Sequence, residues 1–242
     1  MNGQTSNGGF PPTRWTLVLT AGRSDTACAQ RALSELCGTY WYPLYAFIRR
    51  RGHAAHDAQD LTQAFFARLL EKHALADLTR ERGRFRSFLL TALKNFLVDE
   101  WRRQRSAKRG GGCVISLDAV EAESRYALEP VDTLTPERLF ERNWALTLLD
   151  TVYRRLQLEY AATGKGELFA TLKFCLTGVR SDLPYADLAA RLGSNENTVK
   201  TLVRRMRQRY RELLRDEVAQ GVASADEIED ELNGLFRALS DT

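Results

Sequence analysis

The sequence predicts an all-α protein with two small helical domains, a flexible linker between them, and an acidic C-terminal helix. Apolar residues recur at helical spacing in almost every segment, and no segment keeps the alternating pattern of a strand. Three consecutive glycines at 110–112 interrupt the helical pattern near the middle of the chain. Residues 183–215 indicate two helices around a tight turn, and the second helix is strongly cationic.

The first domain is predicted to span residues 24–109. Residues 24–51 indicate one long helix or two helices that break near Pro43. The amphipathic stretch at 57–72 predicts the next helix. Residues 87–105, apolar early and basic late, predict the last helix of the domain, and it ends before the glycines because a helix does not tolerate such a run.

Polar and acidic residues at 110–135 predict a flexible linker, and residues 1–23 predict a largely disordered lead. The second domain is predicted over 136–215, where Pro136 suits the first position of a helix. Residues 216–242 form an acidic extension with eight acids against one base. The rest of the chain is therefore much more basic than the net charge of +4 suggests, and nucleic acid is the partner that such surfaces most often serve.

The spacing of Ala189, Gly193 and Val199 predicts a helix-turn-helix in the second domain. The first helix needs a small residue where its partner crosses it, the turn needs a glycine with positive φ, and the second helix needs an aliphatic residue that faces the first. Ser194 or Asn195 is expected to cap the second helix.

The second helix combines an apolar stripe with a surface that is almost entirely cationic. A solvated helix face usually mixes charges of both signs to gain i,i+4 pairs, whereas one sign suits a major groove flanked by phosphates. The polar residues at the N-terminal tip are expected to reach base edges, and the arginines further along are expected to hold phosphates. The seven cations are Lys200, Arg204, Arg205, Arg207, Arg209, Arg211 and Arg215.

The first domain holds a second basic group, in which aromatic residues alternate with arginines and lysines. Phe88 and Phe96 are expected in the core, whereas Trp101 lies among charges at the end of its helix. An exposed ring can stack on an unpaired base while neighbouring cations hold the backbone. Trp101 therefore has two interpretations, a core residue or a contact for single-stranded or melted DNA.

The sequence predicts no cofactor and no metal site. His53 and His56 lie near Asp57 and Asp60, but a polar loop at the start of a helix is the favoured interpretation of this group. The four cysteines show neither a CxxC pair nor zinc-site spacing, so free thiols in a reducing cytoplasm are expected. These residues are Cys28, Cys37, Cys113 and Cys175.

The sequence also predicts that the protein is not an enzyme and does not bind a membrane. It shows no paired-carboxylate metal site, no phosphate-binding glycine loop and no nucleophile with its base, so no catalytic residue is assigned. No apolar run approaches transmembrane length and no signal peptide opens the chain, so a cytoplasmic location is expected.

Three segments in this order resemble sigma factors of bacterial RNA polymerase, of the extracytoplasmic-function (ECF) type. DAQDLTQAFFARLL is similar to the DAEDLxQExFxRLL helix of that family, and FRSFLLTALKNFLVDEWRRQRSAKR is similar to its next helix. LPYADLAARLGSNENTVKTLVRRMRQRYREL is similar to its helix-turn-helix. The resemblance covers roughly residues 25–215, and it implies that the two domains are sigma regions 2 and 4.

The resemblance implies two partners, core RNA polymerase and promoter DNA, which is bound both as duplex and melted. Region 2 would bind the clamp of the largest subunit through Asp57, Asp60, Gln63, Phe66 and Arg68. It would recognise and open the −10 element through Arg82, Arg84, Arg86, Lys94, Asn95, Asp99, Trp101, Arg102 and Arg103. The recognition helix of region 4, next to the polymerase flap, would read the −35 element through Glu196, Asn197, Thr198, Lys200, Thr201, Arg204 and Arg205.

Two features depart from the family pattern. Ala64 stands where the family usually has an acid, so one polymerase contact is absent or replaced. The acidic extension after Asp216 is an addition with an apolar face. Either it packs on the chain's own DNA-binding domain, or it damps promoter binding by competing with DNA for the basic helix. The sequence also leaves open a separate anti-sigma protein as the regulator.

The alternative function is that of a helix-turn-helix regulator that binds DNA without polymerase. Such a protein usually needs a dimerisation element to span two half-sites. It would not explain the resemblance of the first domain to region 2.

Overall fold

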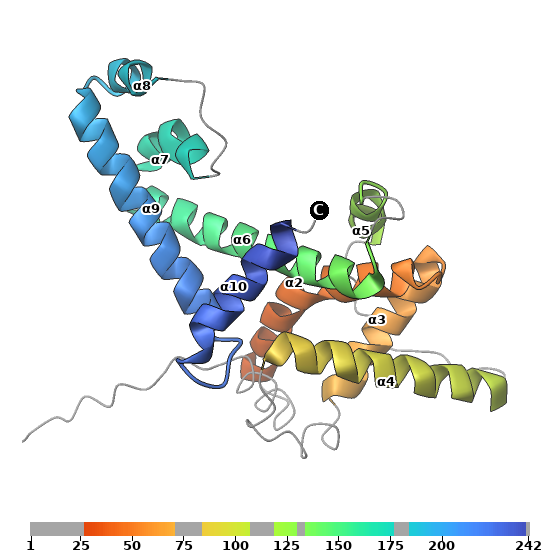
Figure 1. The fold of residues 1–242 in the computed structure, drawn as a ribbon. Coiled ribbons are helices and arrows are strands. Elements are labelled where there is room, and N and C mark those ends of the chain that lie inside the picture. Colours follow the sequence, from red (N-terminus) through yellow and green to blue (C-terminus); the bar gives the residue numbers. More distant parts are fainter. Residues whose placement is uncertain (1–26, 71–83, 107–118, 130–133, 177–183, 241–242) are drawn as a thin grey trace, which may run out of the picture. The chain divides into compact units, whose positions relative to one another are not determined.

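The computed structural model describes residues 27–70, 84–106, 119–129, 134–176 and 184–240, and these residues form helices without a strand among them (Figure 1). The predicted all-α class is therefore confirmed. The chain divides into two compact units. Unit 1 consists of Met1–Leu146 and Val218–Thr242, and unit 2 consists of Thr147–Glu217. The acidic C-terminal helix thus belongs to the same unit as the first helices. The expected lead at 1–23 lies outside the described residues.

Unit 1 begins with two helices that pack on each other, α2 (Ala27–Arg50) and α3 (Ala55–Leu70). Of the two alternatives for the first segment, one continuous helix is confirmed, and it passes through Pro43. Gly52, at a φ of 93°, lies in the short connection between the two helices, where a residue without Cβ avoids a steric penalty.

Helix α4 (Phe85–Ser106) completes the aromatic core of this unit. Phe96 meets Phe65 of α3 edge to face, with 5.7 Å between ring centroids. Phe85 meets Tyr40 of α2 in the same manner at 5.4 Å. Offset or edge contacts of this kind add to the burial of the rings. The first turn of α4 is thereby held against α2, and its middle is held against α3.

A short helix, α5 (Ala119–Tyr126), lies in the segment that the sequence assigned to the linker. Arg49 of α2 pairs with Glu123 at 2.6 Å, and the Tyr45 hydroxyl donates to the same carboxylate. The hydrogen bond from Arg49 holds the pKa of Glu123 below its usual value. Tyr42 donates to Glu129 at 2.8 Å. The described part of this segment is therefore anchored to α2. Residues 107–118 and 130–133 lie outside the description.

Helix α10 (Glu227–Ser240) contributes Leu232 and Leu235 to the core of unit 1. From the sequence we expected this helix to pack on the second domain or to compete for its basic helix. Its buried carboxylate, Glu231, instead contacts Arg84 and Arg86 at the start of α4. The acidic extension is therefore packed into unit 1 through a face that combines apolar residues with one acid.

Unit 2 is built on the later parts of α6 (Pro136–Ala162) and on α9 (Glu196–Ala219), together with α7 (Gly166–Leu172) and α8 (Tyr185–Arg191). A 3-10 turn, Lys173–Cys175, follows α7. Most of the predicted apolar stripe of α9 is buried, namely Val199, Val203, Met206, Leu213 and Leu214, whereas its other two members, Leu202 and Tyr210, are half-buried.

We expect Leu235→Ala to destabilise the protein strongly. This side chain is 0% exposed, and removing it leaves a cavity in the core, which costs about 2–5 kcal/mol. Urea unfolding of the full chain, followed by circular dichroism, measures the change. Phe236→Ala is the matched control, because Phe236 is 54% exposed on the same helix. Equally small effects of both substitutions would contradict the packing of α10 into the core.

Candidate nucleic-acid interface

Helices α8 and α9 are joined by a tight turn with the features that the sequence predicted. Gly193 has a φ of 58°, and the backbone N–H of Ser194 donates to the carbonyl of Ala189 at 2.9 Å. Ala189 and Val199 are both buried. Of the two candidate caps, Asn195 caps α9, because its Oδ1 accepts a hydrogen bond of 2.9 Å from the backbone N–H of Thr198. The turn and the cap fix where α9 begins.

The candidate −35 residues are exposed, and five of them share one side of α9. Asn197, Lys200, Thr201, Arg204 and Arg205 follow the spacing of a single helix face, opposite the buried stripe. The side chain of Lys200 also lies 3.3 Å from Glu196, as an i,i+4 pair. The structure therefore brings these candidates together on the outer surface of one helix. The complete set is Glu196, Asn197, Thr198, Lys200, Thr201, Arg204 and Arg205, all of them exposed.

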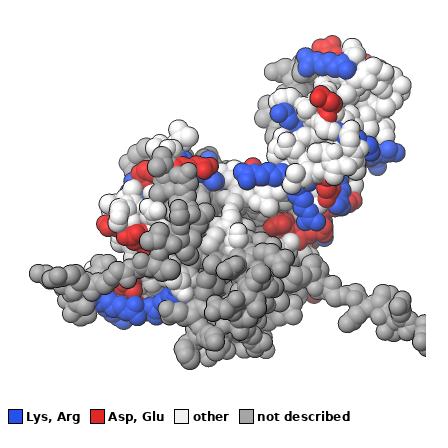
Figure 2. All heavy atoms as spheres, turned by 180° about the vertical axis from the view of Figure 1, so that it is seen from behind, with Lys and Arg blue, Asp and Glu red and all other residues white. Residues whose placement is uncertain are grey.

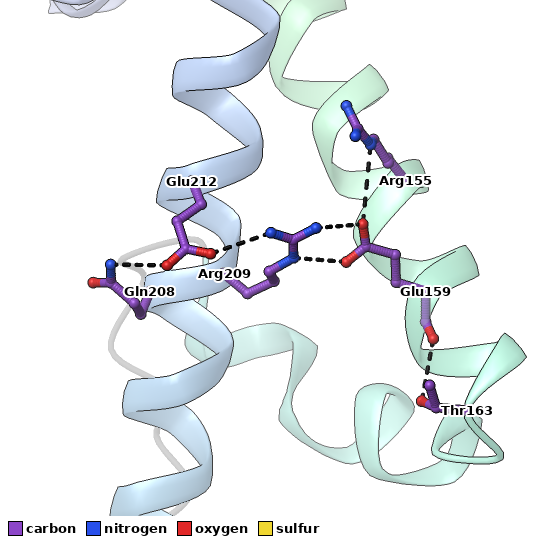
Figure 3. A network of polar contacts seen from close by, with 6 residues as sticks. All are labelled: Arg155, Glu159, Thr163, Gln208, Arg209 and Glu212. Atoms are coloured by element: carbon purple, nitrogen blue, oxygen red, sulfur yellow. Dashed lines mark hydrogen bonds and ion pairs between the residues drawn. The ribbon is translucent and has the colours of Figure 1, made fainter. Parts of the chain in front are cut away.

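Two arginines further along α9 hold unit 2 together, although the sequence assigned them to phosphates. Arg209 forms a bidentate pair with Glu159 of α6, with distances of 2.8 and 2.9 Å, and donates to Glu212 at 3.2 Å (Figure 3). Arg207 donates to the carbonyl of Cys175 at 2.8 Å. The expectation of an unmixed cationic surface is therefore wrong for this part of the helix. Of the other cations of α9, Lys200, Arg204, Arg205, Arg211 and Arg215 are exposed.

The basic group of the first domain is divided between the surface and the interior of unit 1. Trp101 is 58% exposed, so the core interpretation of this ring is wrong, and Phe96 is buried as expected. Asn95, Arg102 and Arg103 are exposed with it. Figure 2 shows lysine and arginine side chains gathered at the end of α4. This end combines an aromatic ring with cations, which is the combination that unpaired bases need.

The other −10 candidates have partners within unit 1 or lie outside the description. Lys94 pairs with Glu137 at 2.8 Å, and Asp99 pairs with Arg68 of α3 at 3.1 Å. Arg86 is buried, whereas the side chain of Arg84 is 32% exposed. Arg82 lies outside the described residues.

The candidate polymerase contacts on α3 also differ in exposure. Asp57 and Asp60 are exposed, and Asp60 lies 3.2 Å from His56. Gln63 and Phe66 are buried, with exposures of 8% and 1%. Arg68 is half-buried and joins α3 to α4 through Asp99. In this structure only the two acids of the set present their side chains fully to the surface.

The sequence did not indicate the cluster that surrounds Arg86. Glu231, Glu141 and the Trp144 ring contact this guanidinium from α10 and α6. One signal was available, because Glu231 falls at helical spacing among Ile228, Leu232 and Leu235, on the apolar face of its helix. An acid in that position needs a buried partner.

Within the described residues, no group of three or more His, Cys, Asp or Glu side chains is placed to hold a metal ion. None of the described helices has the length and apolar character that crossing a membrane requires. Cys37 and Cys175 are buried free thiols, and burial raises the pKa of Cys37 to about 11.

We expect Glu159→Gln to lower the stability of the protein at neutral pH by about 0.5–1 kcal/mol, because solvent screens this partly exposed pair. The hydrogen bond from Arg209 holds the pKa of Glu159 below its usual value of 4.5. The contribution of the Glu159–Arg209 pair to stability is therefore fully present above pH 4.5, and it is lost as the pH falls through the lower pKa that Glu159 has in the folded protein. Urea unfolding across a pH series measures it, with Glu167→Gln as the control. A difference that stays constant with pH would contradict this account.

Comparison with known proteins finds a family model that matches part of the chain. Residues 40–107 match Sigma-70 region 2. Searches of curated proteins and of solved structures found no match. The matched residues include the C-terminal part of α2 from Tyr40, all of α3 and all of α4, and therefore the exposed Trp101 and the acids of α3. Region 2 binds core RNA polymerase and the −10 promoter element. The match supports a sigma factor, involved in promoter recognition and RNA polymerase binding.

Proposed function

We propose that this chain is a sigma factor of the ECF type, which binds core RNA polymerase, recognises −10 and −35 elements and helps to open the promoter. The match of residues 40–107 to region 2 carries the proposal. The same residues expose Trp101 beside Arg102 and Arg103 at the end of α4. We propose that this end stacks on a melted base of the −10 element while the arginines hold the backbone.

The −35 element is assigned to the outer face of α9. Its N-terminal residues are polar and exposed, and its outer face carries Lys200, Arg204 and Arg205. On this proposal α8 and α9 form a helix-turn-helix whose second helix lies in the major groove, and the tight turn before Asn195 supports it. The polar tip then contacts base edges, and the arginines contact phosphates or guanine.

Polymerase binding is assigned to the exposed acids of α3, Asp57 and Asp60, on the clamp of the largest subunit. The buried Gln63 and Phe66 support that surface from inside rather than contacting the partner. The proposed protein is cytoplasmic and acts without chemistry of its own. Its binding energy differs between closed and melted DNA, and this difference shifts the equilibrium towards the open promoter.

A polymerase-independent helix-turn-helix regulator would use the same face of α9. It leaves the region 2 match unexplained. Binding to core polymerase in the absence of DNA separates the two functions.

We expect the full chain to bind core RNA polymerase without DNA, as measured by fluorescence anisotropy of the labelled protein. The double substitution Asp57→Asn with Asp60→Asn should weaken this binding about tenfold, because it removes two exposed charges from the contact. Asp226→Asn is the matched control, since it removes an exposed acid from another helix end. No binding by the unmodified chain would favour the polymerase-independent regulator.

We expect Arg205→Ala to weaken binding to duplex DNA about threefold to tenfold and to reduce the salt dependence by about one counterion. The assay is a salt titration with a labelled mixed-sequence duplex. Arg154→Ala serves as the control, because Arg154 is a 73% exposed arginine of α6 outside the candidate face. If both substitutions changed affinity equally, the assignment of the α9 face would be wrong.

A further inference from the structure

Helix α10 carries a charge into the interior of unit 1. The side chain of Glu231 is 3% exposed, and that of Arg86 is 7% exposed. Arg86 Nε lies 2.7 Å from Glu231 Oε1, and Arg86 Nη2 lies 3.0 Å from Oε2. This bidentate geometry matches the planar guanidinium to both carboxylate oxygens. Two buried charges are tolerated only with such partners, so the pair fixes the position of α10 on α4.

Arg86 has no donor edge turned to solvent in this arrangement. Its Nη1 contacts the Glu141 carboxylate of α6, and its guanidinium lies 4.3 Å from the centre of the Trp144 ring. The resemblance to sigma factors assigned Arg86 to DNA. A guanidinium that is stacked on a ring and held by two carboxylates serves instead as an anchor between α4, α6 and α10.

Arg84 shares the same carboxylate but remains partly at the surface. Its Nε lies 3.1 Å from Glu231 Oε2, and its side chain is 32% exposed. A carboxylate on the Nε edge of a guanidinium restricts its rotation and leaves other N–H groups for a second anion. Glu231 therefore orients the arginine that directly precedes α4, without burying it completely.

Two further contacts fit α10 and the preceding residues to this place. The backbone N–H of Phe85, which no earlier turn of α4 can satisfy, donates to the carbonyl of Gly221 at 2.9 Å. A Cβ at Gly234 would lie 2.7 Å from Arg86 Nη2, so a side chain there would displace the guanidinium that pairs with Glu231. Glycine costs a helix about 1 kcal/mol, which makes its presence in the middle of α10 informative.

We infer that Glu231 is a positioning residue for promoter opening. It fixes Arg86 as the anchor of α4 and orients Arg84 toward a phosphate of promoter DNA, so α10 is a working part of the domain that opens the promoter. This inference rests on the proposed function. If α10 instead masked these arginines and restrained DNA binding, the loss of Glu231 would increase promoter opening rather than reduce it.

The test uses the full chain with core RNA polymerase and a promoter recovered by mapping the transcription starts of the unmodified protein. Permanganate reactivity of unpaired thymines measures promoter opening, and anisotropy measures core binding. Glu231→Gln keeps the shape of the side chain and removes its charge. Asp230→Asn is the matched control, because it removes the neighbouring, exposed charge of the same helix. Arg84→Gln removes the oriented arginine while the pair of Arg86 and Glu231 stays in place.

Glu231→Gln is expected to reduce promoter opening about tenfold, as the loss of one charge-assisted contact allows, with core binding unchanged. Asp230→Asn should open the promoter as the unmodified chain does. Arg84→Gln should reduce opening to a similar extent, and adding Glu231→Gln to it should reduce opening no further. This non-additivity separates orientation of Arg84 from a general loss of structure. Thermal unfolding identifies the temperature at which all variants remain folded.

Three results would overturn the inference. The effects of the two substitutions could multiply, which would mean that Glu231 does not act through Arg84. Opening could increase in Glu231→Gln, which would make α10 a competitor of DNA. Opening in Glu231→Gln could equal that of the unmodified chain, which would leave the proposed function intact without this role. An unmodified chain that opens no promoter would instead overturn the proposed function, and the inference with it.

Discussion

The buried charge of Arg86 is the constraint on which the arrangement of unit 1 depends. A guanidinium inside a protein needs a compensating partner, and here the partners are Glu231, Glu141 and the ring of Trp144. These residues come from α10 and α6, which are distant in sequence from the start of α4. Breaking one such buried pair by removing a partner typically costs about 3–5 kcal/mol. Three segments of the chain are therefore held at one point by one side chain.

The cations of α9 combine contacts within unit 2 with the proposed recognition of DNA. Arg207 and Arg209 are turned to neighbouring segments of unit 2, where a carbonyl and Glu159 accept their hydrogen bonds. Arg204 and Arg205 are exposed beside the polar tip of the helix. Neither charge nor rotation around the helix distinguishes these pairs, because Arg205 and Arg209 are i,i+4 neighbours; the difference is that Arg207 and Arg209 each meet an acceptor in a neighbouring segment. Part of the cationic sequence therefore has a structural role, although Arg211 and Arg215, further along the helix, are exposed as well.

The features predicted correctly from the sequence are those that depend on residues close to one another along the chain. The capping candidates that included Asn195, the turn at Gly193 and the buried stripe of α9 follow from local spacing, and the structure contains all three. The sequence did not predict the interior position of Arg86, because a buried arginine is explained only by partners that are distant along the chain, here Glu141 and Glu231. For the same reason it assigned α5 to a linker, although Arg49 and Tyr45 of α2 hold Glu123. The acid on the apolar face of α10 was the one local sign of this tertiary pairing.

The central claim is that the chain directs RNA polymerase to promoters. Run-off transcription with core RNA polymerase, this protein and a library of genomic fragments, followed by sequencing of the transcript starts, tests it most directly. The account predicts new starts that share two upstream motifs at −10 and −35. The absence of new starts, together with clear duplex binding by the full chain, would contradict it and favour a helix-turn-helix regulator that acts without polymerase.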